Sequence, residues 1–466
     1  MKRINLHIIT LCLAIGAMAQ NPNDSLWHLL PYSKKGNAGI GYQEAVNMMK
    51  DKKPQSIIVA IADAGVDIYH PDLINSLWKN PLEIEGNKID DDNNGYIDDV
   101  YGWNFIGSTT YDNMELTRQY ALLNPIYELK PEAQANNPDE YTTYLEIKDK
   151  FLKDKSESKL FFKFFRTISL GVESIEKKYE RDIDKSIIEN HKSQNKAEEL
   201  AKRMILRYAK ATKSFDIESI KKDLEEGYKQ YDYLYNYAYN TSFNPRIEHV
   251  GDDYQNLTER VYGNNQVYYG EEFSSHGTHV AGIVAADGTN NFGAKGICSS
   301  CKIMSIRNVP EGDERDKDVA NGIRYAVDNG AKIVNMSFGK GYSDFPLTVK
   351  EAIGYAASKD VLLVHAAGND GENNDKSDNF PHDFEDAYPN WIEVGASSWR
   401  SGSKALATFS NYGKTEVDLF SPGVDIYSTT PENQYEAYDG TSMASPVVSG
   451  VAAFVWSYYP SLSAAQ

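Results

Sequence analysis

Ser442 stands where a serine can act as a nucleophile. It follows Asp439, Gly440 and Thr441, which are residue types that end loops and begin helices, and it precedes an uncharged run of small and apolar residues up to Pro460. Such a run predicts a helix that is buried on all sides. The free N–H groups and the positive dipole at the start of that helix can stabilise an oxyanion. Serine is also a preferred helix cap, so Ser442 alone does not decide between a cap and a nucleophile.

A nucleophilic serine needs a base within hydrogen-bonding distance, and the base needs an orienting carboxylate. The chain offers His276 in the segment HGTHVAG and Asp63 in the segment IADAGVD. Asp63 ends a continuous apolar run, SIIVAIAD, which predicts a buried parallel strand. The carboxyl ends of such strands carry the sites of α/β folds. We expect His276 at the start of a helix that follows a loop.

Three segments together identify a family resemblance. GTSMASP around Ser442, HGTHVAG around His276 and IADAGVD around Asp63 resemble the signature segments of subtilisin-like serine peptidases (subtilases), and they occur in that family's order. The resemblance covers residues 53–106 and 262–466. It implies an α/β catalytic domain with a doubly wound, mainly parallel sheet and helices on both faces. It also implies that peptide bonds are hydrolysed through an acyl-enzyme intermediate.

The resemblance extends to the substrate cleft. The segment AAGN resembles the family's pocket wall and oxyanion hole, which implies that the side-chain amide of Asn369 donates to the oxyanion. The segment NMSFG resembles the edge strand that pairs with the substrate backbone. The implied substrate-binding residues are Ser337, Phe338, Gly339, Ala366, Ala367 and Gly368.

Strand-like and helix-like patterns alternate in the second half of the chain. Helical patterns at residues 316–330 and 346–359 separate runs that are typical of buried strands. This alternation predicts a parallel, doubly wound sheet. The strand-like runs are residues 303–309, 331–338, 361–368 and 391–397.

One acidic stretch has the spacing of a calcium loop. Its oxygen-bearing side chains alternate and are followed by a glycine for the turn, as in the first part of a calcium-loop pattern. Tyr101 stands where an EF-hand carries its last ligand, so the stretch is not an EF-hand, and a solvated acidic turn is the alternative. The candidate calcium ligands in this stretch are Asp90, Asp92, Asn94 and Asp98.

The family resemblance implies a further calcium site at Asp72 and Asn290. His279, three residues after His276, lacks the glutamate and the third ligand of a zinc site, so we expect it to be packed and hydrogen-bonded. We expect calcium in a structural role.

Cys298 and Cys301 are the only cysteines that follow the N-terminal segment. A CxxC pair can bind zinc, but no second pair is present to complete a four-cysteine site. In an exported protein, a small local disulfide is the expected state.

Residues 1–19 predict a signal peptide. They have a basic start, an apolar run and a small-residue cleavage site. We therefore expect an exported protein that is secreted or held in the periplasm or at the cell surface. The net charge of −19 argues against nucleic acid as a partner. No later stretch is apolar enough over sufficient length to predict a transmembrane span.

Residues 107–261 differ from their surroundings, because they are rich in Lys, Glu and Tyr and contain amphipathic patterns typical of helices. They predict a helical insertion in the catalytic domain. Its attachment before His276 suggests the hypothesis that it gates substrate, or that it replaces the missing pro-domain as a folding aid or inhibitor. Residues 20–52 form an N-terminal extension that is too short for the pro-domain of many subtilases. The chain stops at Gln466 inside a helix-like pattern, which predicts a truncated domain.

Two rival functions can be weighed on the sequence. An α/β-hydrolase needs its acid and histidine after the serine, and no Asp, Glu or His follows Ser442. The other rival is a non-catalytic, calcium-stabilised binding protein on a subtilase scaffold. The presence of Asp63, His276, Ser442 and Asn369 argues against it. Ala64, where the family usually carries Ser or Thr, and the missing pro-domain keep it open.

Overall fold

The structure is a computed structural model that describes residues 26–32, 38–179, 183–290, 293–384 and 387–466. The predicted signal peptide therefore lies outside the described residues. The described chain forms two compact units: a sheet unit (residues 21–115 and 244–466) and a helical unit (residues 116–243).

A parallel sheet of seven strands organises the sheet unit, in the order β2-β3-β1-β4-β5-β6-β7. The chain adds strands on both sides of β1, which defines a doubly wound sheet and confirms the predicted fold class. The strands are β1 (Ile57–Asp63), β2 (Gly102–Asn104), β3 (Cys301–Arg307), β4 (Ile333–Met336), β5 (Leu362–Ala366), β6 (Trp391–Ser397) and β7 (Leu419–Pro422). A separate antiparallel hairpin contains β8 (Ile426–Thr430) and β9 (Gln434–Tyr438).

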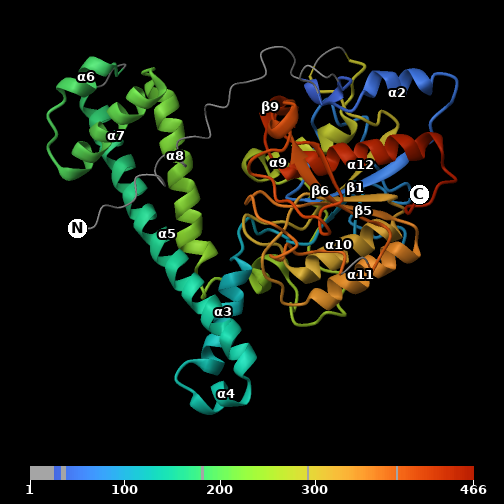
Figure 1. Ribbon diagram of the computed structural model, residues 1–466, viewed down its shortest axis with the longest axis horizontal. Helices are drawn as coiled ribbons and strands as arrows, with labels where there is room; N and C mark the ends of the chain where they lie inside the picture. The colour runs from blue at the N-terminus through green and yellow to red at the C-terminus, as the bar shows by residue number, and fades with distance from the viewer. Residues whose placement is uncertain (1–25, 33–37, 180–182, 291–292, 385–386) are drawn as a thin grey trace. The chain divides into compact units, whose positions relative to one another are not determined.

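Helices cover both faces of the sheet. The helices α9 (Glu271–Ala285) and α12 (Thr441–Tyr458) share one hydrophobic core with β1, and α10 (Asp316–Asp328) and α11 (Pro346–Ser358) share the other. Figure 1 shows α12 in red on one side of the sheet and α10 and α11 on the other. None of the helices in the described ranges combines the length and apolar character needed to cross a membrane.

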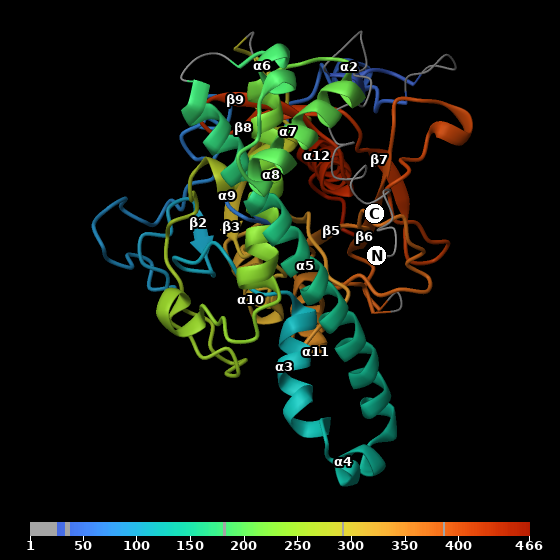
Figure 2. The ribbon, with the colours of Figure 1, turned by 90° about the vertical axis from the view of Figure 1, so that its left-hand side faces the viewer.

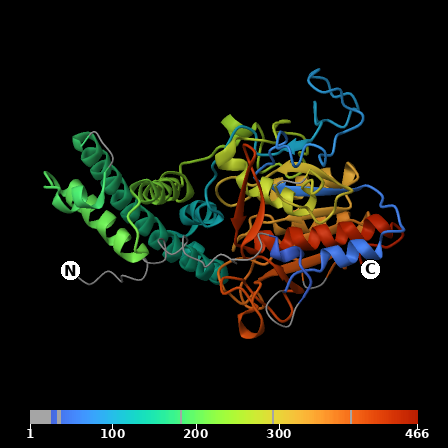
Figure 3. The same ribbon diagram turned by 90° about the horizontal axis from the view of Figure 1, so that it is seen from above.

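The N-terminal extension packs onto the sheet unit. It contains the short 3₁₀ helix η1 (Trp27–Leu29) and α2 (Tyr42–Met48). Figure 3 shows α2 in blue beside α12 in red, where the rings of Tyr42 and Phe454 meet edge to face. The indole of Trp27 is fully buried and donates to the main-chain oxygen of Val424. These contacts give the extension a structural role in the sheet unit.

The helical unit is built around one long helix, α5, against which α7 and α8 pack (Figures 1 and 2). The aromatic run at residues 161–165 stacks within the unit: Phe162 lies on Tyr235, and Phe165 lies on Tyr231. The amphipathic pattern at residues 160–179 lies within α5, and the one at residues 197–215 covers most of α7 and the three residues after it. The unit contains α3 (Glu115–Tyr127, whose first residue belongs to the sheet unit), α4 (Pro131–Asn136), α5 (Pro138–Tyr179), α6 (Lys185–Asn190), α7 (Lys196–Thr212), α8 (Ile217–Tyr233) and the π-helical turn η2 (Leu234–Ala238).

Both chain segments that lead to the helical unit belong to the sheet unit. Asp112 pairs with Arg315 at 2.6 Å, and Arg246, in the π-helical turn η3 (Arg246–Val250), pairs with Asp318 at 2.6 Å. All four side chains are buried. Buried charges are stable only when they are paired, so these pairs hold residues 107–115 and 244–261 to the sheet unit. The compact helical unit, residues 116–243, lies inside the insertion predicted at residues 107–261.

Several element boundaries differ from the predicted ones. The helix that carries His276 begins at Glu271, so His276 lies inside α9 and not at its start. The predicted strand at 331–338 ends at Met336, which leaves Ser337 and Phe338 beyond the strand. The strand at 391–397 matches β6, and the short 3₁₀ helix η4 (Gly402–Lys404) follows it.

Candidate active site

Asp63 lies at the carboxyl end of β1, as its apolar run predicts. Its carboxylate is 3% exposed and accepts a hydrogen bond from the N–H of Ala64 at 2.7 Å. Its main-chain oxygen accepts from the N–H of Asn308 at 3.0 Å, just past β3. Two neighbouring strands thus fix the position of this carboxylate.

His276 faces Asp63 from α9. Its Nδ1 lies 2.9 Å from Oδ1 and 3.0 Å from Oδ2 of Asp63. Gly277 permits this approach, because a Cβ there would lie 2.3 Å from the main-chain oxygen of Gly65. Partial loss of water around the imidazole, which is 40% exposed, acts to lower the pKa of His276, but the charge of Asp63 and the hydrogen bond to it outweigh this effect and raise that pKa above 6.5.

Ser442 is the second residue of α12 and is half-buried. Its hydroxyl donates to the main-chain oxygen of Ser337 at 3.1 Å. Within the described residues, no hydrogen bond joins Ser442 to His276. The side chain of Ser442 is therefore turned toward the segment that resembles the substrate-pairing strand.

Asn369 is held against the start of the same helix. Its Oδ1 accepts from the N–H of Thr441 at 2.9 Å and from the hydroxyl of Thr441 at 3.0 Å. This leaves the side-chain NH₂ group of Asn369 as a donor beside Ser442. The sequence analysis did not predict that Thr441 orients Asn369, although Thr441 directly precedes Ser442.

The predicted substrate-binding segments are close neighbours. Asn379 donates from Nδ2 to the main-chain oxygen of Ala366 at 3.1 Å, and its Oδ1 lies where a Cβ on Gly339 would clash. Gly368 has φ +103°, and a Cβ there would lie 2.5 Å from Asn411. The two segments, 337–339 and 366–368, therefore flank Asn379, which the sequence analysis did not single out.

The acidic stretch places three carboxylates together. Oxygens of Glu83, Asp90 and Asp92 all lie within 4.8 Å of one another. The carboxylate of Asp98 instead accepts from the N–H groups of Gly86 and Lys88. Three oxygen donors suit a hard cation such as calcium. Glu83 has no signal in the sequence pattern, because the loop brings it back from outside the stretch.

The structure also brings Asp72 and Asn290 together, with the Asn290 amide donating to the Asp72 carboxylate. Asp72 is 0% exposed, and no ion pair reaches it from the residues that the structure describes. A buried carboxylate without a cationic partner fits a bound cation, because burial of an unpaired charge is unfavourable.

The sulfurs of Cys298 and Cys301 lie at disulfide distance at the start of β3. Both residues are buried in the core between α9 and the sheet.

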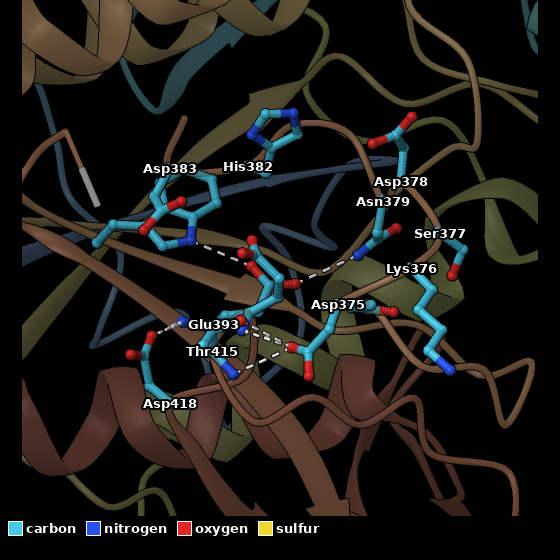
Figure 4. A pocket seen from close by; sticks show the side chains of 13 residues that line it. Asp375, Lys376, Ser377, Asp378, Asn379, His382, Asp383, Glu393, Thr415 and Asp418 are labelled. Carbon is cyan, nitrogen blue, oxygen red and sulfur yellow. Dashed lines mark hydrogen bonds between the residues drawn. The ribbon is translucent and has the colours of Figure 1, made fainter. Parts of the chain in front are cut away.

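A separate acidic pocket of about 320 Å³ is lined by residues 374–379, 382 and 383 and by residues of and after β6 (Figure 4). Glu393 lies at its centre, accepts from Nδ2 of Asn379 at 3.3 Å, and lies 2.9 Å from Nδ1 of His365. The carboxylate of Asp375 accepts hydrogen bonds from the main-chain N–H groups of residues 414–416. These hydrogen bonds hold the pKa of Asp375 far below its ordinary value. None of the pocket's lining residues belongs to the Asp63, His276 and Ser442 set.

The fold and this site define a class of protein. It is a doubly wound α/β protein with an aspartate–histidine pair at the carboxyl edge of its sheet and a serine at a helix N-terminus. The sequence profile of the subtilase family matches residues 55–466, and the chain belongs to that family.

Known proteins are similar over part of the chain. Thermophilic serine proteinase of Bacillus sp. (strain AK1) is 42% identical over 40% of this chain and 43% of its own length. Subtilisin DY of Bacillus licheniformis is 36% identical over 44% of this chain and 74% of its own. Among solved structures, Sphericase shares 31% identity over 45% of this chain and 71% of its own, with a TM-score of 0.39. The chain thus spans about half the length of several of its curated relatives, among them the first.

Proposed function

We propose that this protein is a serine endopeptidase in which Asp63, His276 and Ser442 act as a triad. The observation that carries the proposal is the hydrogen bond between Asp63 and Nδ1 of His276, made at the sheet edge where α12 begins. That bond leaves Nε2 of His276 as the base for the Ser442 hydroxyl. Membership of the subtilase family supports the same reading.

The proposed reaction is acyl transfer. His276 takes the proton of Ser442 as Oγ attacks the peptide carbonyl, and His276 then gives that proton to the leaving amine. Water releases the acyl group from Ser442 by the same route. In its present orientation Ser442 bonds to Ser337, so a rotation of the Ser442 side chain toward His276 precedes attack.

The oxyanion is held by two hydrogen-bond donors that meet at the start of α12. These are the side-chain NH₂ of Asn369 and the main-chain N–H of Ser442, beside the positive end of the helix dipole. The bonds from Thr441 to Asn369 support this role, because they fix the amide with its nitrogen free to donate. Substrate backbone would pair with residues 337–339, and residues 366–368 would form a pocket wall.

Calcium is proposed as a structural ion at two places. Glu83, Asp90 and Asp92 would hold one ion, and Asp72 with Asn290 the other. An ion at either place would neutralise carboxylates and stiffen the loop that carries them. We further propose export, in keeping with the predicted signal peptide, protein or peptide substrates, and a regulatory role for residues 107–261 toward those substrates.

The test is labelling of the purified chain with a fluorophosphonate probe, which reacts only with an activated serine. Labelling of the wild type and its loss in Ser442→Ala would support the triad. A sample treated with a calcium chelator reports whether metal maintains the site. A folded, calcium-loaded wild type that takes no label would favour the non-catalytic binding protein.

A further inference from the structure

A cavity of about 210 Å³ in the sheet unit has His276 in its wall. Ala64 also lines it, and its methyl group leaves space directly after Asp63. If His276 acts on the bond to be cleaved, a substrate side chain close to that bond is the group that reaches this cavity. The residues around it therefore bear on which substrates are accepted.

Glu311 and Glu272 are the two acidic residues that line this cavity. The main chain of Glu311 is fixed, since its N–H donates to Thr110 at 2.8 Å and its oxygen accepts from Asp112 at 3.0 Å. Its exposed carboxylate makes no hydrogen bond or ion pair with any described residue.

Arg307 is the opposing charge in the wall. Its side chain is buried, and its N–H groups donate to oxygens of Ala64, Asn104, Gly107 and Thr109. These acceptors are main-chain or amide oxygens, and none of them belongs to Glu311. With both glutamates ionised and His276 neutral, the cavity carries a net negative charge.

The rest of the wall suits a long aliphatic stem. Phe273, Val309 and Pro310 contribute apolar surface to the same cavity. A lysine or arginine side chain combines such a stem with a cationic end. An acidic or short polar side chain would meet either the carboxylates or unfilled apolar surface.

We propose that this cavity binds a lysine or arginine side chain next to the scissile bond of a peptide substrate, and that Glu311 selects it with support from Glu272. The inference rests on the proposed peptidase function and adds the class of substrate to it. Glu311 carries the selection because its carboxylate can turn toward a ligand without breaking a bond. We expect a preference of about tenfold, the scale of one charge-assisted contact close to the surface.

The experiment compares kcat/KM on fluorogenic peptides that carry Lys, norleucine or Glu at one position at a time, over the three residues on each side of the cleaved bond. In the wild type, the ratio of kcat/KM for the Lys peptide to kcat/KM for the norleucine peptide should be about 10 at one position. Glu311→Gln keeps the shape and removes the charge, so this ratio should fall to about 2 or less. Glu351→Gln, which removes an exposed charge on α11, is the matched control and should keep the ratio.

The wild type alone gives a second measurement that does not depend on the variant folding. Raising NaCl from about 0.05 M to about 0.5 M should reduce the Lys-to-norleucine ratio several-fold, because screening weakens a partly exposed charge pair.

A Lys-to-norleucine ratio near 1 at every position would overturn the proposal. So would an unchanged ratio in a Glu311→Gln protein that still takes the fluorophosphonate label. A preference for Glu would overturn it as well, and would indicate that Arg307 selects the substrate side chain. Absence of label in the wild type would instead overturn the proposed function.

Discussion

Thr441 fixes the side-chain amide of Asn369. Both the main-chain N–H and the hydroxyl of Thr441 donate to the same oxygen of Asn369, at 2.9 and 3.0 Å. Since both groups are donors, the atom that they contact is the amide oxygen, and the amide nitrogen is turned to the other side. The residue before the candidate nucleophile thus sets the donor of the proposed oxyanion hole.

Asn369→Leu should lower kcat by about 10²–10³ with little change in KM, because it removes a donor that acts in the transition state. Thr441→Val keeps one of the two bonds to Asn369, so its kcat should fall by less, about three- to tenfold. Steady-state kinetics on one peptide measures both variants. Equal kcat values for Asn369→Leu and the wild type would contradict the proposed oxyanion hole.

The pH dependence should report His276. Its pKa is raised above 6.5 by Asp63, and only neutral His276 can accept the proton of Ser442. The labelling rate should therefore rise with pH, with a midpoint above 6.5. In Asp63→Asn the raising charge is gone and burial acts to lower the pKa, so the midpoint should move down while the rate falls by about 10⁴. An unmoved midpoint in that variant would contradict the assigned pair.

The same shift has a consequence for stability. The pKa of His276 is higher in the folded state than in the unfolded state. The ion pair with Asp63 therefore makes its full contribution to the free energy of unfolding below pH 6.5. This contribution is lost as pH rises through the folded-state value. The difference in melting temperature between the wild type and Asp63→Asn should shrink accordingly as pH is raised.

Calcium removal should lower the melting temperature, and Asp92→Ala should abolish the part of that effect that comes from the ion at Glu83, Asp90 and Asp92. Asp92 lies in the carboxylate group with Glu83 and Asp90, whereas Asp98 is bonded to main-chain N–H groups. Asp98→Asn should therefore destabilise the loop with and without calcium. Calcium titration followed by calorimetry distinguishes the two. If calcium no longer raises the melting temperature of Asp98→Asn, Asp98 is a calcium ligand after all.

Removal of the helical unit should raise activity on folded proteins more than on short peptides, if it restricts access to the site. The hydroxyl of Thr117 donates to the main-chain oxygen of Ala238 at 2.6 Å, so the two ends of the unit are close together. A short Gly/Ser linker can thus replace residues 116–243. Unchanged rates on both substrates, in a variant that folds, would end the gating hypothesis.

Arg246→Met should reduce the free energy of unfolding by about 3–5 kcal/mol. Arg246 is 3% exposed and pairs with Asp252 and Asp318, and its loss leaves buried carboxylates with fewer cations. Urea denaturation measures the change, and Lys221→Met is the control because Lys221 forms partly exposed pairs. A loss below about 1 kcal/mol would show that Lys317 and water compensate.

The sequence alone determined the features that depend on neighbouring residues. The apolar run before Asp63 forms a buried strand, the small residues after Ser442 form a helix, and the alternation of patterns predicts the doubly wound sheet. Each pattern lies within one element, and its periodicity decides which face is buried. The family signatures likewise occupy short segments.

Tertiary structure decided which residues from distant parts of the chain meet. Glu311 and His276 line the same cavity, and the carboxylate of Asp98 bonds to main-chain N–H groups. The ion pair of Arg246 with Asp318 holds the segment after the helical unit to the sheet unit. No local pattern encodes these contacts, because they form only after the chain has brought separate segments together, as it brings η3 and α10 together for Arg246 and Asp318. Hydrogen-bonding groups then take the partners within reach, as Thr441 does with Asn369.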